Sequence, residues 1–328
     1  MPRGDLPAQV HAAAMRTSAN RQGGVALILV IWVVTLLVAI AGSFLYAMRT
    51  DARAARNAAL IARADALAQA AVARALYEVF KPAGNPEVWK RDEAPRAWSF
   101  DGAEVSVSLS DESAKIDINT ANDELLRGLF RHAGLAEDEA ARLLDAVLDW
   151  RDPDSFRRPN GAEEPEYAQA GLKVKPANYA FQATEELQLV LGMRPEVYQR
   201  IAPMITVNSR QAGVNPHLAR REVLLAIPAV NAEQVDAFIT EREANRGQKR
   251  VPPIFLAAAA YSTYAPVSAV TVRAQVVLPE GISVAREAVA LATPQYPNRP
   301  YTFLAWREVP PQRASAPDTI PKEVPVGR

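Results

Sequence analysis

Acidic side chains are concentrated in one short stretch of this 328-residue chain. Seven carboxylates fall between residues 145 and 166, namely Asp145, Asp149, Asp152, Asp154, Glu163, Glu164 and Glu166. The first two are four residues apart and share one face of a predicted helix. Pro153 ends that helix, because proline disfavours helical backbone at the residue before it. The loop after it, with Pro159-Asn160-Gly161, can fold back and bring the glutamates close.

Calcium binds six to eight oxygen atoms, mostly from carboxylates and carbonyls on flexible loops. The acidic stretch supplies this class of ligand, so a calcium site is one interpretation. The alternative is a solvated acidic surface that neighbouring cations partly neutralise, namely Arg151, Arg157 and Arg158. The residues alone leave both interpretations open.

Enzymatic chemistry finds little support elsewhere in the chain. Paired carboxylates could serve as the acid and base of a glycosidase, but no aromatic sugar platform accompanies them. The chain has no cysteine and three histidines, and neither His132 nor His217 has a G-x-S-x-G element beside it. A phosphate-binding G-x-x-x-x-G-K loop is also missing. The sequence therefore predicts a protein that is not an enzyme.

Charge argues against a general nucleic-acid binder. Lys and Arg number 37 and Asp and Glu number 37, so the formal net charge is zero. Nucleic-acid-binding domains usually carry a basic stripe or an overall positive charge. We expect partners other than nucleic acid.

The N-terminal part of the chain contains a membrane-spanning signal. Val25–Met48 is 24 residues long without a charge, and about 20 apolar residues cross a bilayer. Its 14 Leu, Ile, Val and Phe residues favour insertion by about −4 to −8 kcal/mol. A cleavable secretory signal cut after Ala39-Ile40-Ala41 and a simple signal anchor are the alternatives. Arginines on both sides leave the orientation open, and their count slightly disfavours export of the C-terminal body.

The helix should continue beyond the apolar segment. No Pro or Gly occurs from Ser43 to Lys81, and Ala, Leu and Arg, which are good helix formers, dominate. From Val25 to Phe80 the helix would be about 84 Å long, apolar in its first half and amphipathic over residues 49–82.

The remaining chain alternates between strand and helix signals. Trp98–Ser110 alternates apolar and polar residues and predicts one half-buried strand preceded by a turn, and strand patterns return at Val270–Leu278, Val284–Leu291 and Phe303–Trp306. Between them, residues 116–263 carry mainly helix signals. The predicted fold class is α+β, with a long N-terminal helix packed on a small antiparallel sheet and a large α-helical domain inserted between strands.

Three segments of the insert look like copies of one helix–hairpin–helix unit: Asn119–Phe130, Thr184–Val197 and Asn215–Val230. Such units often bind DNA through glycine-rich hairpins and nearby cations. Residues 111–180, however, carry 15 acidic and 9 basic side chains, a net charge of −6. Packing is the favoured role, and a membrane-anchored DNA-binding or DNA-uptake protein is the alternative function.

Several motifs together resemble one family. The first, Arg21-Gln22-Gly23-Gly24-Val25-Ala26-Leu27, is similar to a prepilin leader junction with its cut between Gly24 and Val25. The others are Asp111–Ala121, Leu148–Asp154, Gly161–Glu164, Glu185-Glu186-Leu187, Leu191-Gly192-Met193 and Tyr301–Glu308. The combination resembles the K-type minor pseudopilins of type II secretion systems over about residues 21–308.

Two positions bear on that resemblance. Most pilin-like proteins have Glu at the fifth position after the cut, where this chain has Leu29. K-type members lack this Glu and sit at the filament tip, so the difference supports the K type. Asn215–Ala219 replaces the Asn-Thr-Ala-type sequence expected in the second repeat, which puts the local geometry there in doubt.

The resemblance implies a role and partners. It implies a tip subunit that starts pseudopilus assembly for protein export across the outer membrane, after cleavage by prepilin peptidase and methylation of the new N-terminus. The partners would be the I-type and J-type minor pseudopilins and then other pseudopilins. The protein would cross the bacterial inner membrane once, with its body in the periplasm. Calcium in the insert is also implied, and we expect its ligands among Asp149, Asp152, Asp154, Glu163 and Glu164.

These expectations divide the chain into consecutive parts. They are a prepilin leader (1–24), a transmembrane and filament-core helix (25–48), its amphipathic continuation (49–82), a sheet built from 83–115 and 264–308, an inserted α-helical domain (116–263) and a disordered proline-rich tail (309–328).

Overall fold

The structure is a computed structural model that describes residues 23–81, 88–248, 250–265, 269–293, 296 and 299–312. The described residues divide into two units, with the boundary between Leu60 and Ile61. The predicted leader before Gly23 and the predicted tail beyond Gln312 lie outside the described residues.

The first helix, α1 (Gly23–Val79), runs for 57 residues without interruption. Side chains from Val25 to Met48 are exposed, and the segment includes a stretch of mean hydropathy 3.0. Its hydroxyl groups bond within the helix: Thr35 Oγ1 donates to the Ile31 carbonyl at 2.7 Å and Ser43 Oγ to the Ile40 carbonyl at 2.8 Å. Because hydrocarbon offers no other partners, these bonds suit the segment to a bilayer.

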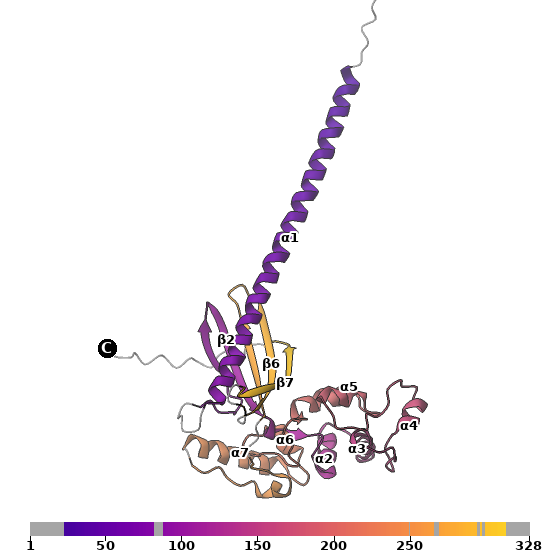
Figure 1. The fold of residues 1–328 in the computed structure, drawn as a ribbon, viewed down its shortest axis with the longest axis vertical. Coiled ribbons are helices and arrows are strands. Elements are labelled where there is room, and N and C mark those ends of the chain that lie inside the picture. Colours follow the sequence, from indigo (N-terminus) through magenta and orange to yellow (C-terminus); the bar gives the residue numbers. More distant parts are fainter. Residues whose placement is uncertain are drawn as a thin grey trace, which may run out of the picture. The chain divides into compact units, whose positions relative to one another are not determined.

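The C-terminal part of α1 packs within the second unit. Every third or fourth residue is buried, namely Ala64, Leu67, Ala68, Ala71, Val72, Ala75, Leu76 and Val79. This spacing marks one face of a helix, and mostly small side chains let a sheet approach closely. The Arg74 guanidinium lies 5.1 Å from the ring of Trp98, and the Phe80 ring stacks on Tyr301. Figure 1 shows this part of the helix lying along the sheet.

The sheet has five antiparallel strands in the order β1-β2-β5-β6-β7. They are β1 (Arg96–Phe100), β2 (Ala103–Asp111), β5 (Ala269–Val277), β6 (Ser283–Ala292) and β7 (Tyr301–Val309). Alternate residues of β2 are buried, while Ser106, Ser108 and Ser110 point to the other face. Strand alternation thus separates an apolar face from a hydroxyl-lined one.

Two sequence expectations about the sheet need correction. The pattern at Trp98–Ser110 is a hairpin of two strands and not one strand, because Asp101 and Gly102 have φ of +49° and +73°. A two-residue turn of this kind matches the twist of paired strands. The proline-rich tail was expected from Val309, but Val309 pairs with Ala285 in β7, and Gln312 bonds the Gln275 side chain at 2.9 Å.

The α-helical insert lies between β2 and β5, as predicted. It contains α2 (Asp123–His132), α3 (Glu137–Arg151), α4 (Glu164–Gln169), α5 (Pro195–Ile201), α6 (Arg221–Leu225) and α7 (Ala232–Gly247). Short 3-10 turns are η1 (Glu112–Ala114), η2 (Thr184–Leu189), η3 (Ala202–Met204) and η4 (Leu256–Tyr261). A parallel pair, β3 (Ile116–Asp117) and β4 (Ile205–Thr206), ties its early and middle parts together.

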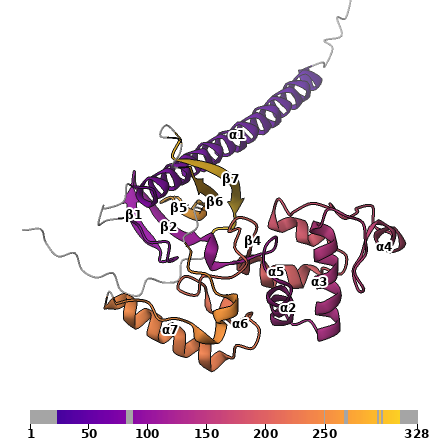
Figure 2. The same ribbon diagram turned by 60° about the horizontal axis from the view of Figure 1, so that its bottom comes forward.

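The insert has its own core. Leu125, Leu126, Leu129 and Phe130 of α2 are fully buried and belong to one cluster with Leu144 of α3. Figure 2 shows α2, α3 and α5 gathered in one group and α6 beside α7 in another. A residue with positive φ stands in three of the connections that precede a helix, at Gly134 before α3, Gly192 before α5 and Ala229 before α7.

Candidate functional site

The acidic stretch is built by the end of α3, the loop after it and the start of α4. Asp149 lies in the last turn of α3 and is fully buried. The loop folds back onto the helix as expected. The backbone amide of Arg158 donates to Asp149 at 3.2 Å, and that of Asn160 donates to Asp145 at 3.0 Å. A Cβ placed on Gly161 would lie 2.0 Å from Asp149 Oδ2, so glycine is required there.

Glu163 is the most perturbed carboxyl group of the loop. Its side chain is 5% exposed, and burial together with the charges of Asp149, Asp152 and Asp154 raises its pKa to about 7. Glu163 Oε1 is buried and has no hydrogen-bond partner among the described residues. A buried oxygen of this kind is costly unless a cation or proton satisfies it.

Asp149 and Asp152 share this environment. Burial raises the pKa of Asp149, which the Asp152 charge raises further, while the backbone amides of Arg158 and Ala162 act against the shift. Burial and the Asp154 charge likewise raise the pKa of Asp152. Asp152 Oδ1 is a second buried oxygen without a partner among the described residues. The three aspartates and Glu163 thus form one group of mutually repelling carboxylates.

Two residues differ from the expected ligand set. Glu164 faces away from this group, with a side chain 70% exposed and an ion pair to Lys175 at 3.3 Å. Asn178 was not predicted. Its Nδ2 donates to the Asp154 carbonyl at 2.7 Å, and its Oδ1 is buried with no hydrogen-bond partner in the described part of the chain. Because Asn178 lies 24 residues beyond Asp154, its part in the loop had no signal in local sequence.

The donor set fits a hard cation. Within the described residues, no three Asp, Glu or His side chains already converge as a complete metal-binding group. The unsatisfied oxygens of Asp152, Glu163 and Asn178 nevertheless belong to the ligand class that calcium prefers. Cations also compete for the loop, since Arg158 lies 3.7 Å from Asp149 and Arg157 lies 3.5 Å from Glu166.

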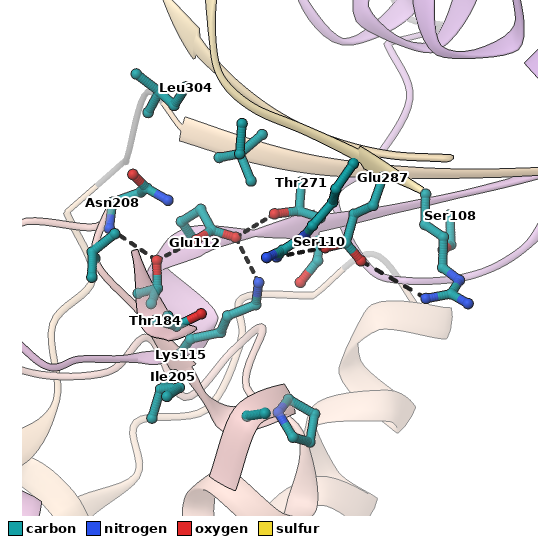
Figure 3. A pocket seen from close by; sticks show the side chains of 18 of the residues that line it. Ser108, Ser110, Glu112, Lys115, Thr184, Ile205, Asn208, Thr271, Glu287 and Leu304 are labelled. Atoms are coloured by element: carbon teal, nitrogen blue, oxygen red, sulfur yellow. Dashed lines mark hydrogen bonds and ion pairs between the residues drawn. The ribbon is translucent and has the colours of Figure 1, made fainter. Parts of the chain in front are cut away.

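A second buried carboxylate joins the insert to the sheet. Glu112, in the turn after β2, is 1% exposed. It pairs with the Lys115 ammonium at 2.7 Å and accepts from the hydroxyls of Thr271 on β5, at 2.5 Å, and Thr206 on β4. Figure 3 shows Glu112 between Thr271 and Lys115. Burial alone would raise the pKa of Glu112, but Lys115 and these hydrogen bonds lower it overall.

The residues after Glu112 fix the start of the insert. Asp117 accepts from the Arg210 amide at 2.7 Å and from the Ser209 hydroxyl at 3.2 Å. Asn119 exchanges two hydrogen bonds with the backbone of Phe181, at 2.9 and 2.8 Å. The segment Asp111–Ala121 therefore holds three distant parts of the chain together.

The hydroxyl-lined face of the sheet borders a cavity of about 490 Å³ at this junction. Ser106, Ser108 and Ser110 line it, and each lysine or arginine at its wall pairs with a glutamate. Arg307 lies 2.8 Å from Glu287 and also pairs with Glu185 of η2. Balanced charge and full pairing point to a structural role for this cavity.

The exposed half of α1 is the remaining candidate. Leu29, at the fifth position after the expected cut, is 62% exposed within the charge-free segment. The peptide bond between Gly24 and Val25 lies in the first turn of α1. One exposed apolar helix of this length suits a single-pass membrane anchor.

Comparison with known proteins relates these features to one family. Residues 107–210 match the family described as type II secretion system (T2SS), protein K. This range includes both the Glu112 junction and the acidic loop.

Curated relatives share that description. The chain is 26% identical over 208 residues to the type II secretion system protein K of Pectobacterium carotovorum subsp. carotovorum, covering 57% of this chain and 63% of that protein. It is 25% identical over 243 residues to the protein K of Pseudomonas aeruginosa, covering 67% and 72%. For the Aeromonas hydrophila protein K the identity is 25% over 263 residues, covering 69% and 77%.

A solved structure shares the fold. A chain of the GspK-GspI-GspJ complex from the enterotoxigenic Escherichia coli type 2 secretion system aligns with a TM-score of 0.53 and 17% identity, covering 80% of this chain and all of that one. The predicted α+β architecture, with a long N-terminal helix, an antiparallel sheet and further helices, is thereby confirmed.

Proposed function

We infer from its membership of the type II secretion system protein K family that this chain is the minor pseudopilin at the tip of the pseudopilus. There it starts filament assembly and so supports protein export across the outer membrane. The similarity to protein K relatives supports the family role. Its position at the tip is our proposal.

Leu29 carries the proposal of a tip position. A carboxylate inside hydrocarbon is costly unless it has a partner. A subunit inside a pilin-like filament can pair such a group with the N-terminal amine of the subunit above it. The described helix has no acidic residue before Asp51. This subunit therefore has no carboxylate in the apolar segment that would need the N-terminal amine of a subunit above it.

Substituting Leu29→Glu tests this directly. With nothing above, the new carboxylate stays unpaired, at a cost below the about 2.5–3.5 kcal/mol of a charge at the bilayer centre, because Leu29 lies near one end of the apolar segment. We expect fewer pseudopili and less secretion than with the matched variant Leu29→Met. Equal activity of the two variants would mean that a partner amine is present above Leu29.

We propose further that prepilin peptidase cuts between Gly24 and Val25 and that Val25 becomes methylated. The mature helix would cross the inner membrane once, with the body in the periplasm. Mass spectrometry of the purified protein should give a chain that begins at methylated Val25. A chain that begins at Gly42 would instead indicate a secretory signal cut after Ala41.

The proposed partners are the I-type and J-type minor pseudopilins, followed by other pseudopilins. The similar solved chain comes from a GspK-GspI-GspJ complex, and the exposed length of α1 offers a matching lateral surface. Co-purification of the full-length chain with both proteins from detergent-solubilised membranes tests this, with loss of both partners upon deletion of residues 25–60 as the expected result.

We also propose that the acidic loop binds calcium. The buried, unpartnered oxygens of Asp152 and Glu163 support this. Asp149 and Asp154 would complete the carboxylate group, and Asn178 would add an amide oxygen. When bound, calcium supplies positive charge that relieves the repulsion among these side chains.

Thermal unfolding of the full-length protein with calcium or with a chelator tests the calcium site. Calcium should raise the melting temperature, and the double substitution Asp152→Asn with Glu163→Gln should remove the response. Glu164→Gln, which removes an exposed carboxylate paired with Lys175, is the matched control and should keep it. Equal melting curves with calcium and chelator in the unsubstituted protein would contradict the proposal.

DNA binding remains the alternative function for the repeated helix hairpins. Salt-dependent retention of the protein on DNA would favour it, since phosphate contacts weaken steeply with salt. Our proposal predicts no such retention.

A further inference from the structure

A second cavity, of about 330 Å³, lies beside the C-terminal half of α7 and is lined by cations. Arg242 and Arg246 come from α7, Arg250 follows that helix, and Lys90 comes from the segment before β1. His217, in the turn before α6, completes the polar wall, while Leu218 and Pro252 supply apolar surface. No carboxylate is among the described residues that line the cavity.

The two arginines of α7 are held in place by main-chain oxygens. Arg242 Nη1 donates to the carbonyls of Pro216 and Ala219, both at 2.8 Å. Arg246 Nη2 donates to the His217 carbonyl at 3.2 Å. The Arg242 side chain is only 11% exposed, and burial lowers its pKa. These guanidinium groups are therefore fixed before any ligand arrives, which lowers the entropy lost on binding.

The local acids do not neutralise this group. Glu243 pairs with both Arg242 and Arg246 at 3.2 Å, and it is the carboxylate those two guanidinium groups share. The described residues offer no ion pair to Lys90 or to Arg250, which are both exposed. Four cations therefore face one carboxylate and the partial negative charge of the α7 C-terminus, which amounts to about half a charge.

Helix capping explains only part of this arrangement. Cations in the last turn of a helix interact favourably with its dipole, and Arg246 occupies that turn. Arg242 lies a turn earlier, and Lys90 belongs to a segment more than 140 positions away. Helix capping therefore does not explain why four cations line one cavity.

We propose that this cavity binds a phosphate group. A phosphate carries about two negative charges at neutral pH and three acceptor oxygens, so it can engage several separate cations at once, and guanidinium groups bind it in bidentate fashion. A single carboxylate would leave most of the positive charge unmatched. The phosphate could be a soluble anion or the headgroup of an anionic lipid, whose phosphodiester offers the same kind of acceptor oxygen with less charge and fewer free oxygens.

The test measures binding to the full-length protein in a non-ionic detergent. Isothermal titration with inorganic pyrophosphate provides the soluble arm, and micelles doped with phosphatidylglycerol, compared with phosphatidylcholine, provide the lipid arm. Lys90→Gln with Arg250→Gln removes the two cations to which the described residues offer no ion pair. The matched control, Arg142→Gln with Lys173→Gln, removes the same charges from exposed positions outside the cavity.

We expect the parent protein to bind the probe in at least one arm, and the control variant to bind it with the same affinity. The Lys90→Gln, Arg250→Gln variant should bind it about tenfold or more weakly, which corresponds to about 1.4 kcal/mol of binding free energy. A preference for one arm identifies the source of the phosphate. Absence of binding in both arms, or equal affinity of the two variants, would overturn the proposal. Because neither variant alters α1 or the acidic loop, failure here leaves the pseudopilin role untouched.

Discussion

Glu112 and Glu163 are both buried carboxylates in the second unit of the protein, yet their surroundings are opposite. Glu112 has an ammonium and two hydroxyl partners, and its pKa is lowered. Glu163 has other carboxylates around it, one unpartnered oxygen and a pKa raised to about 7. The first is complete within the chain, and the second needs a proton or a cation from outside.

This difference in partners distinguishes a carboxylate with a structural role, Glu112, from one suited to ligand binding, Glu163. A buried charge that finds all its partners in its own chain fixes neighbouring segments, as Glu112 does for β4 and β5. A buried charge without partners destabilises the apo protein and favours ligand uptake. The two sites should therefore respond oppositely to substitution and to pH.

The largest effect is expected at Glu112. Substitution Glu112→Ala leaves Lys115, Thr206 and Thr271 without their shared acceptor and should lower the free energy of unfolding by about 3–5 kcal/mol. Chemical denaturation at neutral pH measures this. The exposed Glu280→Gln serves as control. A loss below about 1 kcal/mol would show that the junction depends on other contacts.

The pH dependence of the Glu112 contribution has a defined sign. Because the pKa is lower in the folded than in the unfolded state, the contribution is full above a pH of about 4.5 and is lost as the pH falls below it. Denaturation of Glu112→Gln and the parent protein across this range should show their difference shrinking in acid.

Glu163 should show the reverse behaviour. Its pKa is higher in the folded state, so without calcium the free energy of unfolding should fall as pH rises from about 4.5 to about 7. Glu163→Gln should remove this slope and stabilise the apo protein at pH 8 by up to about 3 kcal/mol. If the apo protein loses no stability over this interval, Glu163 is not the strained group.

A smaller effect should follow from crowding the acidic loop. In Gly161→Ala the added methyl would overlap the buried Asp149 carboxylate, which should destabilise the protein by about 1–2 kcal/mol. The shifted loop should also weaken the rise in melting temperature with calcium. The corresponding change Gly171→Ala, where no atom lies within 4 Å, has a backbone penalty but should leave the calcium response intact.

The smallest effect is expected at Glu164. Its pair with Lys175 is solvent-exposed, and such pairs contribute about 0–1 kcal/mol. Glu164→Gln should therefore leave both the free energy of unfolding and the calcium response nearly unchanged. A lost calcium response would restore Glu164 to the ligand set.

Periodic features of the fold were predictable from the sequence, since they depend on local spacing. The helix from Val25 onward and the strand containing Val105, Val107 and Leu109 follow from apolar patterns. The same pattern concealed the hairpin, because Trp98 and Phe100 alternate in phase with the next strand. Asp101-Gly102 marked a turn, but the strand before it had no separate signal.

The sites were predictable only in part, because burial and partners depend on residues far apart in sequence. The charges of Asp149, Asp152 and Asp154 act on Glu163, since all four residues flank one loop, and whether they bind a metal stays a prediction. Glu164 follows Glu163 directly, but at the start of α4 it turns toward Lys175. The partners of Glu112, Thr206 and Thr271, lie 94 and 159 residues away, beyond any local pattern.

The position of the protein in the filament tests its proposed function most directly. The chain has no cysteine, so Lys173→Cys at an exposed position gives a single thiol for gold labelling. In pseudopili assembled from the full set of subunits, electron microscopy should show gold at one end of each filament. Gold at intervals along the filaments would contradict a tip subunit.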